Sequence, residues 1–494
     1  MIAQLTTQNR IINVSNRLPV KLAKEGGTLS FHPSEGGLAT GLNSLLDSYE
    51  SLWIGWPGAV VEDAKKQEVK DYLMNQSLFP VFLNQEEVDK FYEGFSNETL
   101  WPLFHYFPTY SIYKEDYWEA YVKANRKFAD AVISMAQPDD IIWIHDYQLM
   151  LVPSMIREVL PDVRIGYFQH IPFPDFEIFR SLPWKTELIE GILGADIIGF
   201  QTDEDVRYFI RTIEKVLGKP CTEDGLTIGN RSVVVKSFPI SIDYGKFRSL
   251  ATHENTLLNV SRIKNIIHTK IALSVDRLDY SKGIIQRLKA FDLFLSRYKN
   301  WHQKVTLIHI IVPSRDTVSN YKELKTEMDQ LVSCINGKYA SLGWQPIHHY
   351  YQSFDPYMLS AFYQCADLAI VTPLRDGMNL VSKEYIACNI NKNGVLLLGE
   401  AAGAANELHD ALLLNPNNSD EFARKIYEGL NISSEEKQKR MSRMQQVIAD
   451  ADIFKWANSF ISKLLSIVTD RSKKTKKNTV ALPLTTPTPN NMAV

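Results

Sequence analysis

The segment between residues 372 and 384 carries the strongest chemical signal in the sequence. Thr372-Pro-Leu-Arg-Asp-Gly-Met-Asn-Leu-Val-Ser-Lys-Glu384 follows an apolar run and is expected to open a helix near Met378. Unpaired amides at a helix N-terminus favour an anion, and Gly377 would let a diphosphate approach the backbone. Glu384 could accept hydrogen bonds from a ribose diol. Taken alone, a strand–turn–helix capped by Asp376 explains the segment equally well.

A second segment of the same kind is Ser274-Val-Asp-Arg-Leu-Asp-Tyr-Ser-Lys-Gly283. It also follows an apolar run, and it places Arg277 and Lys282 in one short loop. Both cations could reach the same phosphates, and each charged hydrogen bond would contribute about 1.5–3 kcal/mol. Surface ion pairs with Asp276 and Asp279 are the alternative. Two such loops in one half of the chain favour nucleotide binding.

The N-terminal half has matching features. Arg17 ends the first predicted strand, Gly36 and Gly37 precede a predicted helix, and Asp146 and His170 follow further strands. A glycine pair often serves only to turn the chain, and a single strand-end histidine is more often structural. Because several strand ends of this kind meet at one edge of a parallel sheet, a binding role is favoured here.

Two aromatic residues, Tyr92 and Trp101, could pack against sugar rings and present a polar edge to them. Packing in the hydrophobic core explains each of them equally well.

The elements that would position these residues are short runs of consecutive apolar residues. The runs do not alternate between apolar and polar residues, which is typical of strands buried on both faces. The runs are Ile11–Val14, Ile141–Ile144, Ile165–Phe168, Ile197–Phe200, Ile271–Val275, Leu307–Val312, Leu368–Val371 and Val395–Leu398. Helical stretches separate many of them: Asp205–Leu217, Ile285–Tyr298 and Val318–Cys334. Alternating strands and helices predict an α/β fold with parallel sheets.

The runs fall into two groups, before and after about residue 240. We expect an N-terminal Rossmann-like domain over residues 1–240, completed by a C-terminal helix at about 452–468, and a second Rossmann-like domain over 241–451. Two such domains would face each other across a cleft. The basic run and the Pro/Thr/Asn-rich end, residues 470–494, predict a disordered tail.

Composition excludes several classes of protein. The chain has 494 residues and a net charge of −3, without the basic excess of a nucleic-acid-binding or membrane-surface protein. The N-terminus has no apolar signal region and no run is long enough to span a membrane, so we expect a cytoplasmic protein. The four cysteines are scattered, which argues against a disulfide framework or a zinc site.

In motif order, from about Arg10 to about Val468, the chain resembles the trehalose-6-phosphate synthases of glycosyltransferase family 20. This is a retaining family of GT-B architecture, with two Rossmann-like domains facing a cleft. The motifs that carry the resemblance are Val14-Ser-Asn-Arg17, Gly36-Gly-Leu, Trp143-Ile-His-Asp-Tyr147, His170-Ile-Pro-Phe-Pro174, Ser274–Gly283 and Leu374–Glu384.

The resemblance implies transfer of glucose from UDP-glucose to glucose 6-phosphate, giving trehalose 6-phosphate and UDP in trehalose biosynthesis. By motif match, the donor would meet Gly36, Gly37, His170, Arg277, Lys282, Phe354, Asp376, Gly377, Met378, Asn379, Leu380, Val381, Ser382, Lys383 and Glu384. The acceptor would meet Arg17, Tyr92, Trp101, Asp146 and Arg315, with the two arginines on its phosphate. The residues nearest the chemistry would be Asp146, His170, Arg277, Lys282 and Asp376.

The family is thought to retain configuration by front-face attack, in which the leaving phosphate takes the acceptor proton. No side-chain nucleophile is then needed. Asp146 and Asp376 could otherwise be mistaken for a glycosidase pair, but hydrolysis would need no diphosphate site. We expect no cofactor, and no essential metal because no Asp-x-Asp metal motif is obvious.

Two other functions remain open. A relative that makes another sugar phosphate, such as glucosylglycerol phosphate, would share the donor site and differ at the acceptor. A catalytically silent regulatory relative is disfavoured by the intact Arg17, Arg277, Lys282, Arg315 and Asp376. The sequence does not decide between UDP, GDP and ADP as the donor nucleotide, nor whether the chain forms a homo-oligomer.

Overall fold

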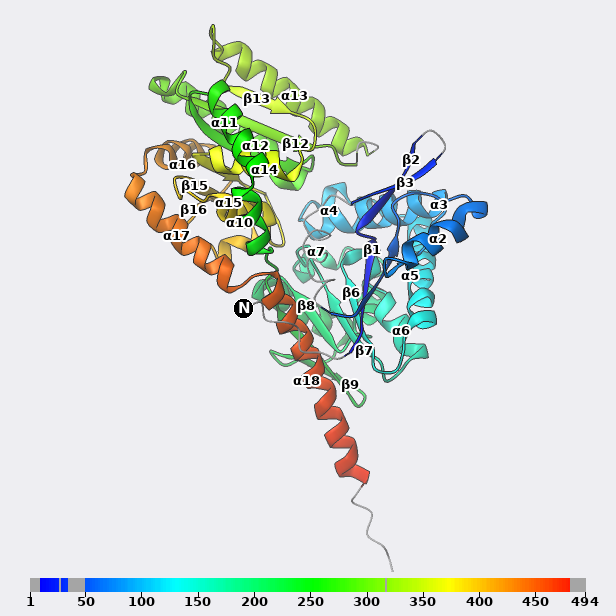
Figure 1. Ribbon diagram of the computed structural model, residues 1–494. Coiled ribbons are helices and arrows are strands. Elements are labelled where there is room, and N and C mark those ends of the chain that lie inside the picture. The colour runs from blue at the N-terminus through cyan, green and yellow to red at the C-terminus, as the bar shows by residue number, and fades with distance from the viewer. Residues whose placement is uncertain (1–8, 26–27, 34–48, 316–317, 480–494) are drawn as a thin grey trace, which may run out of the picture.

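Two separate parallel sheets organise the chain. The computed structural model describes residues 9–25, 28–33, 49–315 and 318–479. The sheets form the centres of two lobes, and the long helix near the C-terminus passes from one lobe to the other (Figure 1). All the apolar runs predicted as strands lie within strands of these sheets.

The first sheet has eight strands and is parallel except for its last pair. Its order is β5 (Leu78–Pro80), β4 (Ser51–Trp56), β1 (Ile11–Arg17), β6 (Ile141–His145), β7 (Arg164–Phe168), β8 (Ile197–Phe200), β10 (Arg231–Ser237) and β9 (Gly225–Ile228). The central strands are buried along almost their whole length. This burial explains why their sequences are continuously apolar. A hairpin of β2 (Val20–Glu25) and β3 (Thr28–Pro33) lies outside both sheets.

The second sheet has six strands, and all its pairs are parallel. Its order is β13 (Ile347–Tyr350), β12 (Val305–Val312), β11 (Lys270–Arg277), β14 (Leu368–Val371), β15 (Val395–Gly399) and β16 (Leu412–Leu414). Parallel neighbours require crossover connections, which the intervening helices supply.

The helices pack around these sheets, as the alternating pattern predicts. In the first lobe they are α2 (Lys66–Met74), α3 (Gln85–Glu87), the π-helix η2 (Val88–Leu100), α4 (Trp101–Phe104), α5 (Glu115–Met135), α6 (Val152–Val159), α7 (Phe176–Phe179), α8 (Lys185–Ile192) and α9 (Asp203–Leu217). In the second they are α10 (Tyr244–Thr252), α11 (Glu254–Ile266), α12 (Ile284–Arg297), α13 (Ser319–Tyr339), α14 (Pro356–Cys365), α15 (Leu380–Cys388), α16 (Ser419–Asn431) and α17 (Ser434–Asp450). No helix among the described residues is long and apolar enough to cross a membrane.

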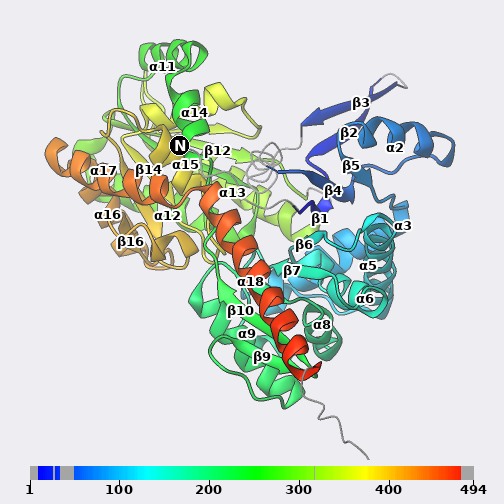
Figure 2. The same cartoon turned by 60° about the horizontal axis from the view of Figure 1, so that its bottom comes forward.

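Helix α18 (Ile453–Thr479) returns from the second lobe to the first and lies on the first sheet (Figure 2). Phe460 stacks on Trp143 with ring centroids 4.9 Å apart. A Cβ added at Gly166 or Gly199 would come within 2.6 or 2.8 Å of the Phe460 ring, so these strand positions need glycine. The last helix therefore belongs to the core of the first lobe.

The stretch predicted to be disordered begins within α18, which continues to Thr479. Lysine and arginine are good helix formers, and extending a helix that packing has already nucleated costs little. Residues 480–494 lie outside the described part of the chain.

Candidate active site

Six of the predicted site residues lie where parallel strands end. They are Arg17, Asp146 and His170, after β1, β6 and β7 of the first sheet, and Arg277, Arg315 and Asp376, after β11, β12 and β14 of the second. In open α/β sheets this is the edge at which ligands bind. Together with Trp101 and Lys282 we call these residues the interdomain site.

On the first lobe, Arg17 rests against two aromatic rings. Its guanidinium carbon lies 4.9 Å from the ring centroid of Trp56 and 5.0 Å from that of Tyr92. Both distances are in the range of cation–π contacts. A stacked guanidinium keeps its in-plane N–H groups free for an anion.

Trp101 brings the two lobes together. The guanidinium carbon of Arg315 lies 4.2 Å from its ring centroid, and that of Arg277 lies 5.6 Å away. The indole N–H is buried and has no hydrogen-bond partner among the described residues. A buried donor without a partner is costly, and a polar ligand would relieve that cost.

Arg315 is held in place from several sides. It donates to the phenol oxygen of Tyr321 at 2.6 Å and to that of Tyr147, in the other lobe, at 3.4 Å. The carboxylate of Asp279 lies 3.8 Å away. The backbone of Arg315 has a φ of 53°, which few residues other than glycine adopt. The site therefore holds this cation in a defined orientation before any ligand binds.

Lys282 and Asp376 join the two loops of the second sheet. The Lys282 ammonium donates to the Asp376 carboxylate at 2.6 Å, and Asn379 donates to the same oxygen at 3.0 Å. Burial by itself would raise the pKa of Asp376, but the attraction and hydrogen bond of Lys282 outweigh it and the pKa is lowered. The Asp376 carboxyl is therefore ionised at neutral pH.

The segment 377–384 forms the start of α15, which begins at Leu380 rather than near Met378 as predicted. Asn379 has a φ of 81° and caps the helix by accepting from the Ser382 amide. Gly377 lies against the other lobe, since a Cβ there would come 2.3 Å from the carbonyl oxygen of His170. Met378 and Ser382 are buried, whereas Leu380 and Val381 are half-buried.

The remaining predicted donor residues differ in what they can offer a ligand. Glu384 accepts from the Tyr363 hydroxyl at 2.9 Å, and burial raises the pKa of its carboxyl. Phe354 is half-buried and packs edge-on against Phe362. The Lys383 side chain is buried and engaged elsewhere, so it does not face the interdomain site as a free cation.

Asp146 and His170 are linked through the backbone. Asp146 has a φ of 76° and accepts from the His170 amide at 3.1 Å. Burial raises the pKa of the Asp146 carboxyl to about 6. The His170 ring lies 3.1 Å (Nε2 to Nδ1) from His145, and burial holds the pKa of both imidazoles far below the usual range. Both histidines are therefore neutral hydrogen-bonding groups at pH 7.

The family model of glycosyltransferase family 20 matches residues 9–466. The chain belongs to glycosyltransferase family 20. The resemblance seen in the sequence motifs is thereby confirmed, and so is the GT-B architecture of two Rossmann-like domains.

Among family-20 relatives, a bifunctional trehalose-6-phosphate synthase/phosphatase of Thermoproteus tenax is 40% identical over 94% of this chain, which spans 65% of that relative's length. A Burkholderia xenovorans trehalose-phosphate synthase (UDP-forming), solved in complex with glucose-6-phosphate, is 31% identical with a TM-score of 0.83, covering 92% of this chain and all of the other. An E. coli protein bound with UDP-2-fluoro glucose is 34% identical with a TM-score of 0.81, covering 92% and 99%.

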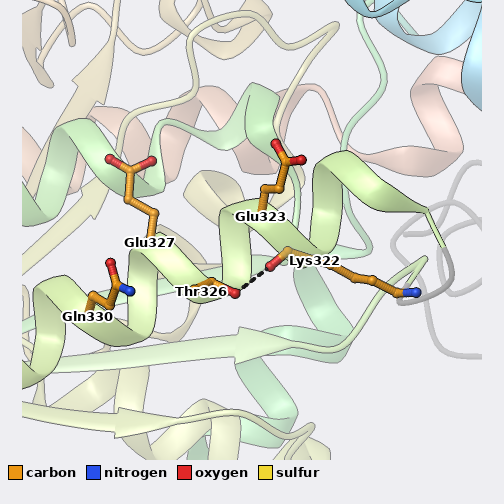
Figure 3. A pocket seen from close by; sticks show the side chains of 5 residues that line it. All are labelled: Lys322, Glu323, Thr326, Glu327 and Gln330. Atoms are coloured by element: carbon orange, nitrogen blue, oxygen red, sulfur yellow. Dashed lines mark hydrogen bonds between the residues drawn. The ribbon is translucent and has the colours of Figure 1, made fainter.

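Three further features of this family-20 chain concern residues other than those of the interdomain site. Gly36 and Gly37 fall outside the described residues. Among those described, no group of three or more His, Cys, Asp or Glu side chains is arranged to hold a metal ion. A shallow hollow on the exposed face of α13 contains no predicted site residue (Figure 3). It is lined by Lys322, Glu323, Thr326, Glu327 and Gln330.

Sequence reasoning missed Arg287, which lies in α12 and is fully buried. Its guanidinium pairs with Asp276 at 2.8 Å and donates to Ser274, Thr372 and the Lys282 carbonyl. It thus ties together the loops that carry Arg277, Lys282 and Asp376. The available signal was an arginine on the apolar face of a predicted helix, between Ile284 and Leu288.

Proposed function

We propose that this chain transfers glucose from UDP-glucose to glucose 6-phosphate with retention of configuration, giving α,α-trehalose 6-phosphate and UDP. The observation that carries the proposal is that Arg277 and Arg315 of the second sheet lie over Trp101 of the first lobe, while Arg17 ends a strand of the first sheet. A reaction between two anionic substrates needs positive charge on both sides of the reacting bond. Membership of family 20 and the ligands in the two solved relatives support the same reaction.

We assign the acceptor to the domain of residues 1–240 completed by the helix at 452–468, and the donor to the domain of 241–451. The packing of α18 on the first sheet supports this division. The acceptor phosphate would bind between Arg17 and Arg315, each of which lies over an aromatic ring. Tyr92, Trp101 and Asp146 would orient the acceptor sugar.

On the donor side, the diphosphate would bind Arg277, Lys282 and the amides at the start of α15, with Gly36 and Gly37 contributing from the other domain. Stretch 380–384 would hold the ribose through Glu384, and Phe354 would border the base. The charge on the departing UDP grows in the transition state, where fixed cations and helix amides stabilise it most.

His170 and Asp376 would hold hydroxyls of the donor glucose. Asp376 is already paired with Lys282 at 2.6 Å, which suits a binding role better than that of a nucleophile. No side-chain nucleophile is required, because the leaving phosphate takes the acceptor proton. Closure of the two domains would exclude water that would otherwise hydrolyse the donor.

The reaction as proposed uses no cofactor and no essential metal, takes place in the cytoplasm, and involves neither nucleic acid nor membrane. Its partners are the two substrates.

The test is product analysis by mass spectrometry after incubation with UDP-, GDP- or ADP-glucose and with glucose 6-phosphate, glycerol 3-phosphate or glucose. We expect a disaccharide phosphate from UDP-glucose and glucose 6-phosphate. Trehalase digestion after phosphatase treatment would establish the α,α-linkage. Preference for glycerol 3-phosphate would move the enzyme to the glucosylglycerol phosphate class. Donor binding without any transfer product would indicate a silent regulatory relative.

A further inference from the structure

The connector between the two domains consists of residues 238–243, between the end of β10 and the start of α10. One of its residues, Ile240, is hydrogen-bonded through its backbone to both domains. The carbonyl of Ile240 accepts from the Lys383 ammonium at 2.8 Å, and its amide donates to the Gln201 side chain at 2.9 Å. Lys383 belongs to donor helix α15, whereas Gln201 follows β8 in the other domain.

Lys383 is buried, with its side chain only 2% exposed. A buried ammonium is costly unless it is paired and hydrogen-bonded. Its charge is balanced by Glu407 at 2.6 Å, and the Ile240 carbonyl accepts a second of its N–H groups. The side chain is therefore directed at the connector, although it lies within the sequence segment that matches the donor-binding motif.

Gln201 extends the chain of contacts to the interdomain site. Its side-chain amide lies 3.4 Å from the carbonyl oxygen of His170, to which it donates. That oxygen is the atom that a Cβ at Gly377 would approach to 2.3 Å. The contacts form a closed ring, from Gly377 through His170, Gln201 and Ile240 to Lys383, which returns to the helix next to Gly377.

The connector is also tied to the second crossing between the domains. The amide of Ile453, the first residue of α18, donates to the Ile242 carbonyl at 3.0 Å, and the Trp456 indole donates to the Phe238 carbonyl at 3.1 Å. The connector is thus an ordered, hydrogen-bonded hinge. A rotation between the domains must change backbone angles here.

We propose that Lys383 and Gln201 are positioning residues: through the Ile240 peptide they set the angle between the domains and hold His170 against the start of the donor helix. The inference rests on the proposed function for its kinetic readout only. Lys383 then contributes to transfer without contacting the donor. Its hydrogen bond to the Ile240 carbonyl stabilises the domain orientation in which that bond can form.

The experiment compares two nearly isosteric substitutions, Lys383→Met and Gln201→Met, with matched controls. Lys437→Met and Gln445→Met remove a buried lysine and a buried glutamine from α17, in the same domain as Lys383. Gln445 donates to the carbonyls of Ile386 and Asn389 at the end of α15 and not to the connector, so it controls for the loss of a buried amide next to the same helix. The measurements are the Kd for UDP, the radius of gyration with and without UDP plus glucose 6-phosphate, and kcat and KM.

We expect Lys383→Met and Gln201→Met to leave the Kd for UDP within about threefold. We expect kcat to fall about 10- to 100-fold, because small misplacements of reacting groups are costly. The compaction on adding both ligands should be reduced in both variants, unchanged in the controls, and partly restored in Lys383→Arg. Because Gln201 lies in the other domain, its variant decides the question if Lys383→Met does not fold.

Two results would overturn the inference. One is a loss of UDP affinity beyond about tenfold in Lys383→Met with normal compaction, which would make Lys383 a donor ligand. The other is wild-type compaction and kcat in Gln201→Met. If the wild-type chain forms no trehalose 6-phosphate, the proposed function fails, whereas the scattering and UDP measurements still decide the role of the hinge.

Discussion

The proposed donor and acceptor sides of the interdomain site hold their cations in different ways. On the proposed donor side, Lys282 is paired with the partly buried carboxylate of Asp376 at 2.6 Å, and behind it the buried Arg287 is paired with Asp276 at 2.8 Å. On the acceptor side, Arg17 and Arg315 stack on the rings of Trp56 and Trp101. The first arrangement relies on close charge pairs. The second relies on aromatic rings, and Arg315 is held in addition by Tyr321 and Tyr147 and by the more distant carboxylate of Asp279.

The difference fits what each side would do in the proposed reaction. The leaving group would gain negative charge during transfer, so its cations would need fixed positions more than free charge. The acceptor phosphate would keep its charge throughout, so its cations would serve mainly to bind and to select. Loss of an acceptor contact should therefore appear mainly in KM, and loss of a donor contact mainly in kcat.

The largest effect should come from removing the phosphate of the acceptor. Free glucose would leave two arginines without their anion, and two contacts of about 1.5–3 kcal/mol each predict a loss of about 10²–10⁴ in kcat/KM relative to glucose 6-phosphate. Arg315→Ala should reproduce part of that loss as a higher KM for glucose 6-phosphate, with the KM for UDP-glucose nearly unchanged. Similar kcat/KM values for the two acceptors would refute the phosphate clamp.

On the donor side, Lys282→Ala should lower kcat by about 10²–10³, the loss typical of removing one group that stabilises developing charge. Arg277→Ala should lower kcat as well, because Arg277 is exposed and its guanidinium lies over Trp101. In both, kcat and kcat/KM should fall together in steady-state assays. A higher KM alone, or unchanged kinetics with an intact fold, would show that donor and acceptor cations do not differ in role.

The sequence predicted the parts of this comparison that depend on residue type and spacing. Continuous apolar runs predicted the buried strands. Cations at or after the ends of those runs identified Arg17, Arg277 and Lys282 as candidate ligands of an anion. Partners distant in sequence were not predictable, such as the contact between Lys282 and Asp376, 94 residues apart. Neither was the burial of Arg287, nor the direction of the Lys383 side chain, because a motif match places the backbone and does not decide where a long side chain turns.

The carboxylates of the two sides should differ in their effect on stability. Burial raises the pKa of Asp146 from 3.8 to about 6, so the unfolded chain loses this proton first as the pH rises. Stability due to Asp146 therefore falls between about pH 4 and pH 6 and stays low above it. Asp146→Asn should stabilise the protein at pH 7 by up to about 3 kcal/mol, and hardly at pH 4.

Asp376 is the contrasting case, since Lys282 lowers its pKa and the charged pair stabilises the fold at neutral pH. Asp376→Asn should destabilise the protein by up to about 3 kcal/mol at pH 7, because it leaves the partly buried Lys282 ammonium without its carboxylate. Urea unfolding of both variants at pH 4 and pH 7 checks the two signs. Destabilisation by Asp146→Asn at pH 7 would show that the hydrogen bonds accepted by the carboxylate outweigh the cost of its burial.

The smallest expected effect is that of chelation. If Arg277, Lys282 and the amides of α15 supply the positive charge for the departing UDP, a divalent cation adds little, and activity should stay within about twofold after exhaustive treatment with EDTA. A metal-dependent glycosyltransferase in the same buffer verifies that chelation is complete. The Lys282→Ala variant gives a sharper test. If Lys282 supplies the positive charge that a metal would otherwise supply, added Mg²⁺ should raise the activity of this variant and leave that of the wild type unchanged. Complete loss of wild-type activity in EDTA, restored by Mg²⁺, would show that the donor-side cations do not suffice for leaving-group stabilisation.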